Sequence, residues 1–103
     1  MPPLKTQRTV FFVSDRTGIT AELLGKTLLT QFPNVEFRRR TVPFVDTVDK
    51  AQAVVAEINE TARQDSQRPI VFNTLVNDDV RTVVTSANAL FLDIFADFIG
   101  RLE

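Results

Sequence analysis

The fold is decided by the stretch Thr-Val-Phe-Phe-Val-Ser-Asp-Arg-Thr-Gly-Ile-Thr at residues 9–20. Its first part, 9–13, is β-branched or aromatic and carries no charge, which is typical of a strand buried on both faces of a sheet. Polar residues then interrupt the apolar run. From Thr20 to Phe32 apolar residues recur every three or four positions, which predicts an amphipathic helix that Pro33 ends. The stretch therefore predicts a strand, a tight turn and a helix.

The same alternation of strand and helix continues along the rest of the chain. The further predicted elements are an edge strand at 35–42, a helix at 48–62, a strand at 70–75 and a helix capped by Asn77 or Asp78. Residues 89–95 could form a strand or a helix, and we favour a strand at 90–94 that leads into a helix from about Ala96. The pattern predicts an α/β fold, a small doubly wound parallel sheet of about four strands with helices on both faces. Right-handed crossovers give the strand order 2-1-3-4.

Composition limits the chemistry that the chain can perform. Its 103 residues are 44% hydrophobic and 24% charged, as in one globular domain. The net charge of −1 gives no electrostatic reason to expect nucleic acid or a membrane surface as a partner. Without Cys or His there is no thiol nucleophile, no imidazole base and no metal site of those ligands. No apolar run resembles a signal peptide or a membrane span, so we expect a cytoplasmic protein.

A ligand is expected at the carboxyl edge of the sheet, where the order of strands reverses. That point lies between the first and third strands, and the polar candidates there are Ser14, Asp15, Arg16, Thr17, Gly18, Thr20, Asn73 and Thr74. Hydroxyls and the first N–H groups of a helix suit a phosphate or substrate anion, whereas Asp15 would repel one unless it is paired with Arg16 or a metal. Asp46 and Asp93 follow the second and fourth strands at the same edge.

Each polar cluster also has a purely structural interpretation. The residue types at 14–20 are those that any strand-to-helix turn requires. The run 38–40 (Arg-Arg-Arg) could contact a phosphate or a partner, but charges that protect an edge strand are the favoured explanation. Asp78 and Asp79 could hold a metal, but acids in a first helical turn more often interact with the helix dipole. Phe91, with the phenylalanines that follow it, indicates core or a partner interface.

Three segments carry a resemblance to a known family. They are residues 8–22 (Arg-Thr-Val-Phe-Phe-Val-Ser-Asp-Arg-Thr-Gly-Ile-Thr-Ala-Glu), 43–46 (Pro-Phe-Val-Asp) and 68–76, which starts with Arg-Pro-Ile-Val-Phe. In order and spacing the chain resembles the bacterial phosphoenolpyruvate synthase regulatory proteins, which belong with the pyruvate, phosphate dikinase regulatory proteins. The resemblance runs from Arg8 over nearly the whole chain.

The resemblance implies a bifunctional serine/threonine kinase and pyrophosphorylase. Such a protein phosphorylates a threonine of the synthase or dikinase with ADP as donor, and removes that phosphate with inorganic phosphate, releasing pyrophosphate. The family's P-loop lies in its carboxyl-terminal half, and no GxxxxGK[ST] motif occurs here. We therefore expect a flexible tail at 1–7 and, at 8–103, the amino-terminal domain of a longer protein. The catalytic residues are then outside this chain, and the domain alone should be inactive and hold no cofactor.

Two other functions remain open at the level of sequence. The chain could be a non-catalytic α/β module that binds an anion or a protein. It could also be a structural domain that forms a homodimer through its edge strand or its Phe-rich end. A continuation of the chain that contains a P-loop would favour the kinase.

Overall fold

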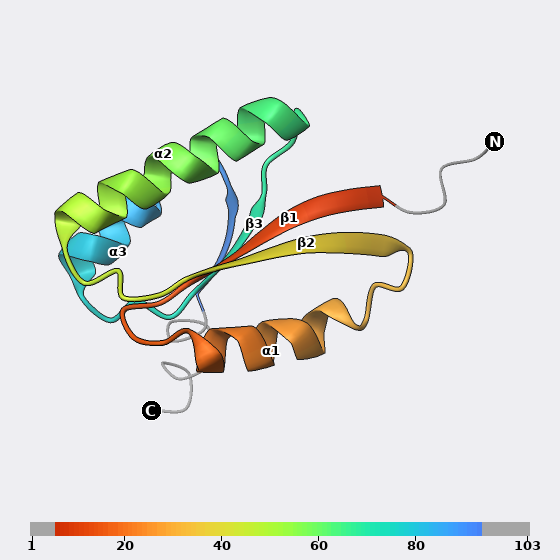
Figure 1. Ribbon diagram of the computed structural model, residues 1–103, viewed down its shortest axis with the longest axis horizontal. Coiled ribbons are helices and arrows are strands. Elements are labelled where there is room, and N and C mark those ends of the chain that lie inside the picture. Colours follow the sequence, from red (N-terminus) through yellow and green to blue (C-terminus); the bar gives the residue numbers. More distant parts are fainter. Residues whose placement is uncertain (1–5, 94–103) are drawn as a thin grey trace.

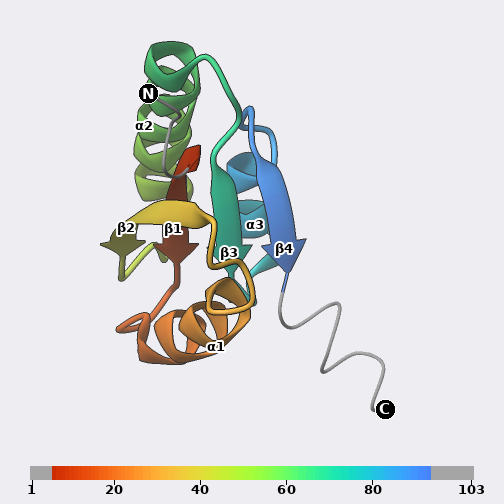
Figure 2. The same ribbon diagram turned by 90° about the vertical axis from the view of Figure 1, so that its right-hand side faces the viewer.

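The computed structural model describes residues 6–93. The elements in this part are β1 (Thr6–Val13), α1 (Ile19–Leu29), β2 (Val35–Val42), α2 (Val48–Asp65), β3 (Ile70–Asn73), α3 (Asp78–Val84) and β4 (Leu90–Asp93). The strands form one sheet in the order β2-β1-β3-β4, and each neighbouring pair is parallel (Figure 2). The predicted α/β fold and the predicted order 2-1-3-4 are both confirmed.

The central strand β1 is buried on both of its faces. It pairs with β2 along its whole length, from Thr6 to Val13, and with β3 over its second half. Side chains of a strand alternate between the two faces of a sheet. Phe11 therefore packs in a cluster with α2 and α3, whereas Phe12 packs in a second cluster with α1. Figure 1 shows these helices on opposite sides of the sheet.

Helix α1 lies unusually close to the sheet because of a glycine. The rings of Phe12 and Phe72 are stacked, with centroids 5.5 Å apart and planes 15° from parallel. A Cβ atom added at Gly25 would lie 2.1 Å from Cε1 of Phe12. The backbone of α1 at Gly25 therefore rests directly on the edge of this ring, and any larger residue would push the helix away.

Helix α2 covers the other face and is defined at both ends. Thr47 accepts a hydrogen bond from the Lys50 N–H at 3.2 Å, as an N-cap does. At the far end Ser66 adopts a left-handed conformation with φ of 54°, and its N–H donates to the Arg63 carbonyl. The buried positions between these caps are Ala51, Val54, Ile58 and Ala62. Their spacing of three or four residues is the amphipathic pattern predicted from the sequence.

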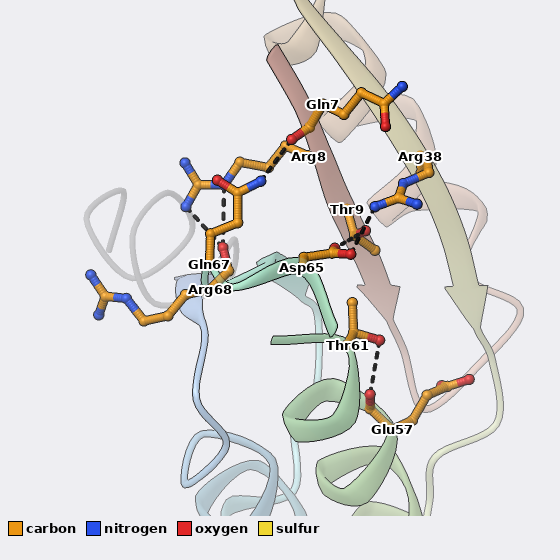
Figure 3. A network of polar contacts seen from close by, with 9 residues as sticks. All are labelled: Gln7, Arg8, Thr9, Arg38, Glu57, Thr61, Asp65, Gln67 and Arg68. Carbon is orange, nitrogen blue, oxygen red and sulfur yellow. Dashed lines mark hydrogen bonds and ion pairs between the residues drawn. The ribbon is translucent and has the colours of Figure 1, made fainter. Parts of the chain in front are cut away.

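The amino edge of the sheet is closed by internal polar contacts (Figure 3). Asp65, at the end of α2, accepts hydrogen bonds at 2.9 Å from Thr9 of β1 and from Arg38 of β2. Arg8 donates through Nε and Nη2 to the carbonyl of Arg68, and the Gln67 amide donates to the carbonyl of Gln7. These contacts join α2, β1 and the start of β3, and they leave the carboxyl edge as the open side of the sheet.

Several boundaries differ from the sequence prediction. Strand β1 begins at Thr6, so Thr6 and Gln7 belong to the sheet rather than to a tail. Helix α1 ends at Leu29 rather than Phe32, and the Phe32 N–H donates to the Leu29 carbonyl at 3.1 Å in a tight turn before Pro33. Strand β3 ends at Asn73 rather than Leu75, because the Asn73 side chain accepts the Leu75 N–H at 2.7 Å and bends the chain out of the sheet.

Two predictions on the ends of the chain fall outside the described residues. They are the rest of the proposed amino-terminal tail and the helix from about Ala96. Within residues 6–93, no helix combines the length and apolar character needed to cross a bilayer.

Gly25→Ala should destabilise the protein. Alanine favours a helix over glycine by about 1 kcal/mol, but overpacking a core costs about 1–3 kcal/mol and the ring of Phe12 is held by Phe72. We expect the clash to win and the midpoint of urea unfolding to fall. In the Phe12→Leu background, where the ring is absent, the same change should be neutral or stabilising. Equal stability of Gly25→Ala and wild type would contradict this packing.

Candidate functional site

The turn after β1 is tied to both neighbouring strands. The Ser14 N–H donates to the Val42 carbonyl at 3.1 Å, and the Ser14 carbonyl accepts from Val45 at 2.9 Å. On the other side the Thr74 N–H donates to the Val13 carbonyl at 3.1 Å. The turn is therefore a rigid continuation of the sheet, positioned between the ends of β2 and β3.

Gly18 connects this turn to α1 and has two reasons to be glycine. Its φ is +85°, a conformation that costs little only for glycine. A Cβ atom here would also lie 2.8 Å from Cγ2 of Thr41 on β2. The adjoining contact is a hydrogen bond of 2.6 Å from the Thr41 hydroxyl to the carboxylate of Glu22, in the first part of α1. Together these contacts fix the direction in which α1 leaves the sheet.

A cavity of about 270 Å³ opens at this point of the carboxyl edge. The residues that line it are Ser14, Asp15, Arg16, Thr17, Gly18, Ile19, Thr20, Thr74 and Val76. The structure thus brings together seven of the eight candidates that the sequence proposed. The cavity lies between the ends of β1 and β3, which is where a switch point places a ligand.

Asn73 is the candidate that does not reach the cavity. It follows Phe72, which packs toward α1, so strand alternation directs Asn73 to the α2 and α3 side. The residue is fully buried, and its Oδ1 accepts the Leu75 N–H. Its Nδ2 has no hydrogen-bond partner in the described part of the chain. The side chain of Asn73 therefore stabilises the turn after β3. Its backbone lies near the site, but its side chain does not line the cavity.

The cavity is lined by one carboxylate and one guanidinium that do not form an ion pair with each other. Asp15 is half-buried and Arg16 is exposed, and no ion pair between them is present among residues 6–93. The Ser14 hydroxyl is buried and accepts the Arg16 N–H at 3.0 Å. The cavity therefore combines one guanidinium that is free to bind an anion with one carboxylate that can accept a proton or bind a cation.

Three apolar residues at the same edge were not identified from the sequence. Ile19 and Val76 line the cavity although both are more than half exposed. Phe44 is 55% exposed and has a φ of 60°, which is costly for a residue with a side chain. Its N–H donates to the Arg16 carbonyl at 2.8 Å, which holds it in that conformation. The motif Pro-Phe-Val-Asp contained this residue, but periodicity carries no signal for a strained, exposed aromatic side chain.

The acidic residues farther around this edge have structural partners. The ammonium group of Lys50 donates to Asp46 at 2.8 Å, and this hydrogen bond lowers the pKa of the Asp46 carboxyl. Asn77 caps α3 by accepting the Val80 N–H, and Asp78 pairs with Arg81 at 2.7 Å. Asp78 and Asp79 lie in the first turn of α3, where the helix-dipole interpretation places acidic residues. Among residues 6–93 no group of three or more potential metal ligands occurs.

The three arginines at 38–40 lie on an edge strand, as predicted from the sequence. Arg38 pairs with Asp65 at 2.9 Å and Arg40 pairs with Glu57 at 2.5 Å, both on α2. Arg39 points to the opposite face, beside Lys26 and Phe37. In the described sheet β2 is an edge strand, and charges along it discourage pairing with another chain.

Comparison with known proteins identifies the family of this chain. Residues 10–103 match the family described as kinase/pyrophosphorylase. A protein of Ectopseudomonas mendocina is 50% identical over 97 residues, one of Pseudomonas aeruginosa is 50% identical over 100 residues, and one of Pseudomonas putida is 48% identical over 97 residues. Each is named as a proposed phosphoenolpyruvate synthase regulatory protein. The alignments cover 94%, 97% and 94% of this chain, but only 36% of each relative.

The fold and the cavity define a doubly wound α/β domain with an open site at its switch point. The chain belongs to the kinase/pyrophosphorylase family. It spans about a third of the length of these relatives.

Gly18→Ala should lower the stability of the protein by about 1–3 kcal/mol. The substitution forces a side chain into a left-handed conformation and against Thr41. Adding Thr41→Ser removes the methyl group but keeps the hydroxyl that binds Glu22, so the double variant should recover the part due to the clash. Urea unfolding measures both effects. A Gly18→Ala variant as stable as wild type would show that the turn is not constrained as described.

Lys50→Met should raise the pKa of Asp46 toward its ordinary value, because the variant loses the hydrogen bond that lowers it. NMR titration of the Asp46 carboxyl measures this directly. Because the pKa of Asp46 is lower in the folded state than in the unfolded state, its ionisation stabilises the fold at pH values above the unfolded pKa of about 4. This contribution is lost as the pH falls from about 4 through the folded-state pKa. An unchanged Asp46 titration in Lys50→Met would contradict the ion pair.

Proposed function

We propose that the full-length protein is a bifunctional regulator of phosphoenolpyruvate synthase or of pyruvate, phosphate dikinase. In one direction it transfers a phosphoryl group from ADP to a threonine of the target enzyme. In the other it removes that group with inorganic phosphate and releases pyrophosphate. The observation that carries the proposal is the family match over residues 10–103, supported by relatives named as regulators of the synthase.

In this proposal residues 8–103 form the amino-terminal domain, and other parts of the protein supply the nucleotide site. The chain has three lysines, and none follows the glycine spacing of a P-loop. ADP and inorganic phosphate therefore bind mainly to residues outside this chain. In this proposal the domain by itself is inactive, because the residues that bind the nucleotide are supplied by other parts of the protein.

The cavity at the end of β1 is proposed to contact the phosphoryl group or the threonine that carries it. Hydroxyls of Ser14, Thr17 and Thr20 line it, and the guanidinium of Arg16 has no partner in the described residues. These groups donate hydrogen bonds to phosphate oxygens. Asp15, the one carboxylate among the described residues that line the cavity, would orient Arg16 or the attacking hydroxyl.

The proposed setting is the bacterial cytoplasm, with the target enzyme as protein partner and no role for nucleic acid or a membrane. A homodimer formed through β2 would have to overcome the charges along that edge strand. The alternative is a non-catalytic module that binds an anion or a protein at the same cavity. It is favoured by the absence of a histidine base, and it differs from the first proposal in predicting no dependence of either reaction rate on Asp15.

Asp15→Ala and Thr17→Ala in the full-length protein should each reduce the kinase and the pyrophosphorylase rate, by roughly tenfold to a thousandfold, because each removes a group that positions or stabilises the transferring phosphoryl group. Both reactions are assayed with the purified target enzyme. Thr27→Ala is the matched control, because Thr27 is on α1 but its hydroxyl donates only to the Leu23 carbonyl.

Wild-type rates in both cavity variants would mean that the turn is structural. Loss of activity in Thr27→Ala as well would point to a general effect on folding rather than to the cavity.

A further inference from the structure

The run of arginines at 38–40 is divided between the two faces of the sheet. Arg38 and Arg40 form ion pairs with acidic residues of α2. Strand alternation directs Arg39 to the α1 side, where it lines a groove together with Lys26 of α1. Arg39 is therefore the one arginine of this run that shares its surroundings with a second cation instead of an acid.

This groove has a volume of about 330 Å³ and is lined by residues of α1 and of the edge strand β2. Leu29 and Phe37 are half-buried and form its apolar wall, whereas Lys26 and Arg39 are exposed. Thr30 completes the described lining. The groove therefore combines two positive charges with an apolar surface.

No acidic residue of α1 or β2, both of which are described by the structure, balances these charges. Glu22, the one acid of α1, accepts a hydrogen bond from a hydroxyl of β2. Glu36, the one acid of β2, is three residues before Arg39 and so lies on the opposite face. Neither Lys26 nor Arg39 has an ion-pair partner among residues 6–93. Like charges that line one groove repel each other, and a bound anionic group removes that repulsion.

The groove fits a protein surface better than a small molecule. Sites for small molecules bury most of the ligand, but both cations of this groove are exposed. Exposed charges at an interface attract a partner of opposite charge and speed its association. A polypeptide segment that places an acidic side chain at the two cations and an apolar side chain against Phe37 satisfies both parts of the groove.

The groove is close to the cavity at the end of β1. Ile19 lines the cavity and Lys26 lines the groove, and both residues belong to α1. Seven residues of helix extend about 10 Å, a distance that an extended polypeptide covers in about three residues. A segment with its threonine in the cavity therefore reaches the groove with residues that are near this threonine in sequence.

We propose that the groove between α1 and β2 binds an acidic segment of the target enzyme, adjacent to the threonine that the cavity receives. Lys26 and Arg39 contact its carboxylates, and the apolar wall contacts a neighbouring side chain of the same segment. The inference rests on the proposed function, because that function defines the partner. It adds a second contact, which selects the protein substrate and takes no part in phosphoryl transfer.

The test is Arg39→Glu in the full-length protein, assayed in both reactions with purified phosphoenolpyruvate synthase. The KM for the synthase should rise by roughly tenfold or more, because a carboxylate then faces the acidic segment. The kcat at saturating synthase and the KM for ADP should stay within about twofold of wild type, as expected when only uniform binding is lost. The melting temperature should not fall, because the new carboxylate replaces a charge that repels Lys26. Lys26→Gln, which removes one charge from α1, should raise the same KM to a smaller extent and serves as the test if Arg39→Glu does not fold.

Arg68→Glu is the matched control. Its side chain is exposed at the amino edge of the sheet and has no partner among residues 6–93, since only its carbonyl accepts hydrogen bonds there. Equal KM values for the synthase in Arg39→Glu and Arg68→Glu would overturn the proposal, because net charge alone would then explain any effect. A raised KM for ADP in Arg39→Glu would also overturn it and would assign the groove to the nucleotide.

Calorimetric titration of the full-length protein with the synthase separates this inference from the proposed function. A wild-type protein that binds the synthase but performs neither reaction contradicts the proposed function, whereas weaker binding by Arg39→Glu still supports the groove. Both reactions at wild-type KM in Arg39→Glu overturn the groove alone. A wild-type protein that does not bind the synthase overturns both.

Discussion

The burial of β1 on both faces is the constraint on which the rest of the structure depends. A strand with Phe11 directed to one side and Phe12 to the other can be removed from water only if apolar layers form on both sides. The three crossovers, which run through α1, α2 and α3, place α1 on one side and α2 with α3 on the other. The same arrangement puts β2 and β3 on either side of β1, so that the ends of β1 and β3 meet at the switch point.

The two edges of the sheet differ because their polar groups are satisfied in different ways. At the amino edge, Asp65 accepts hydrogen bonds from two strands, and the backbone carbonyls of Gln7 and Arg68 are bound by side chains. At the carboxyl edge the backbone of the β1 turn is held by its neighbours, but several side chains are left to solvent. A ligand gains hydrogen bonds at an edge of the second kind, whereas at the first it would have to displace existing ones.

The family is shown for this chain, whereas the activity is proposed for the full-length protein. The family match covers nearly the whole chain, yet the chain spans 36% of the relatives' length. In the proposed function this domain, which has no P-loop motif, positions the phosphoryl group or its acceptor and leaves the nucleotide to other parts of the protein. Its rigid turn, fixed by Gly18 and by contacts to β2 and β3, is suited to that role, because a group that positions a substrate must itself be held in place.

The sequence by itself determined the element order, the parallel sheet and the strand order, because unbroken apolar runs and helical periodicity report burial directly. The sequence also determined which polar residues follow β1, and that Thr74 lies beside them. Only the tertiary structure decided that Asn73 turns away from the cavity, since one residue of register changes the face on which a side chain lies. The same holds for the strained, exposed Phe44 and for the contact of Gly25 with Phe12. These features depend on how closely distant segments approach, and local patterns of hydrophobicity carry no information on that distance.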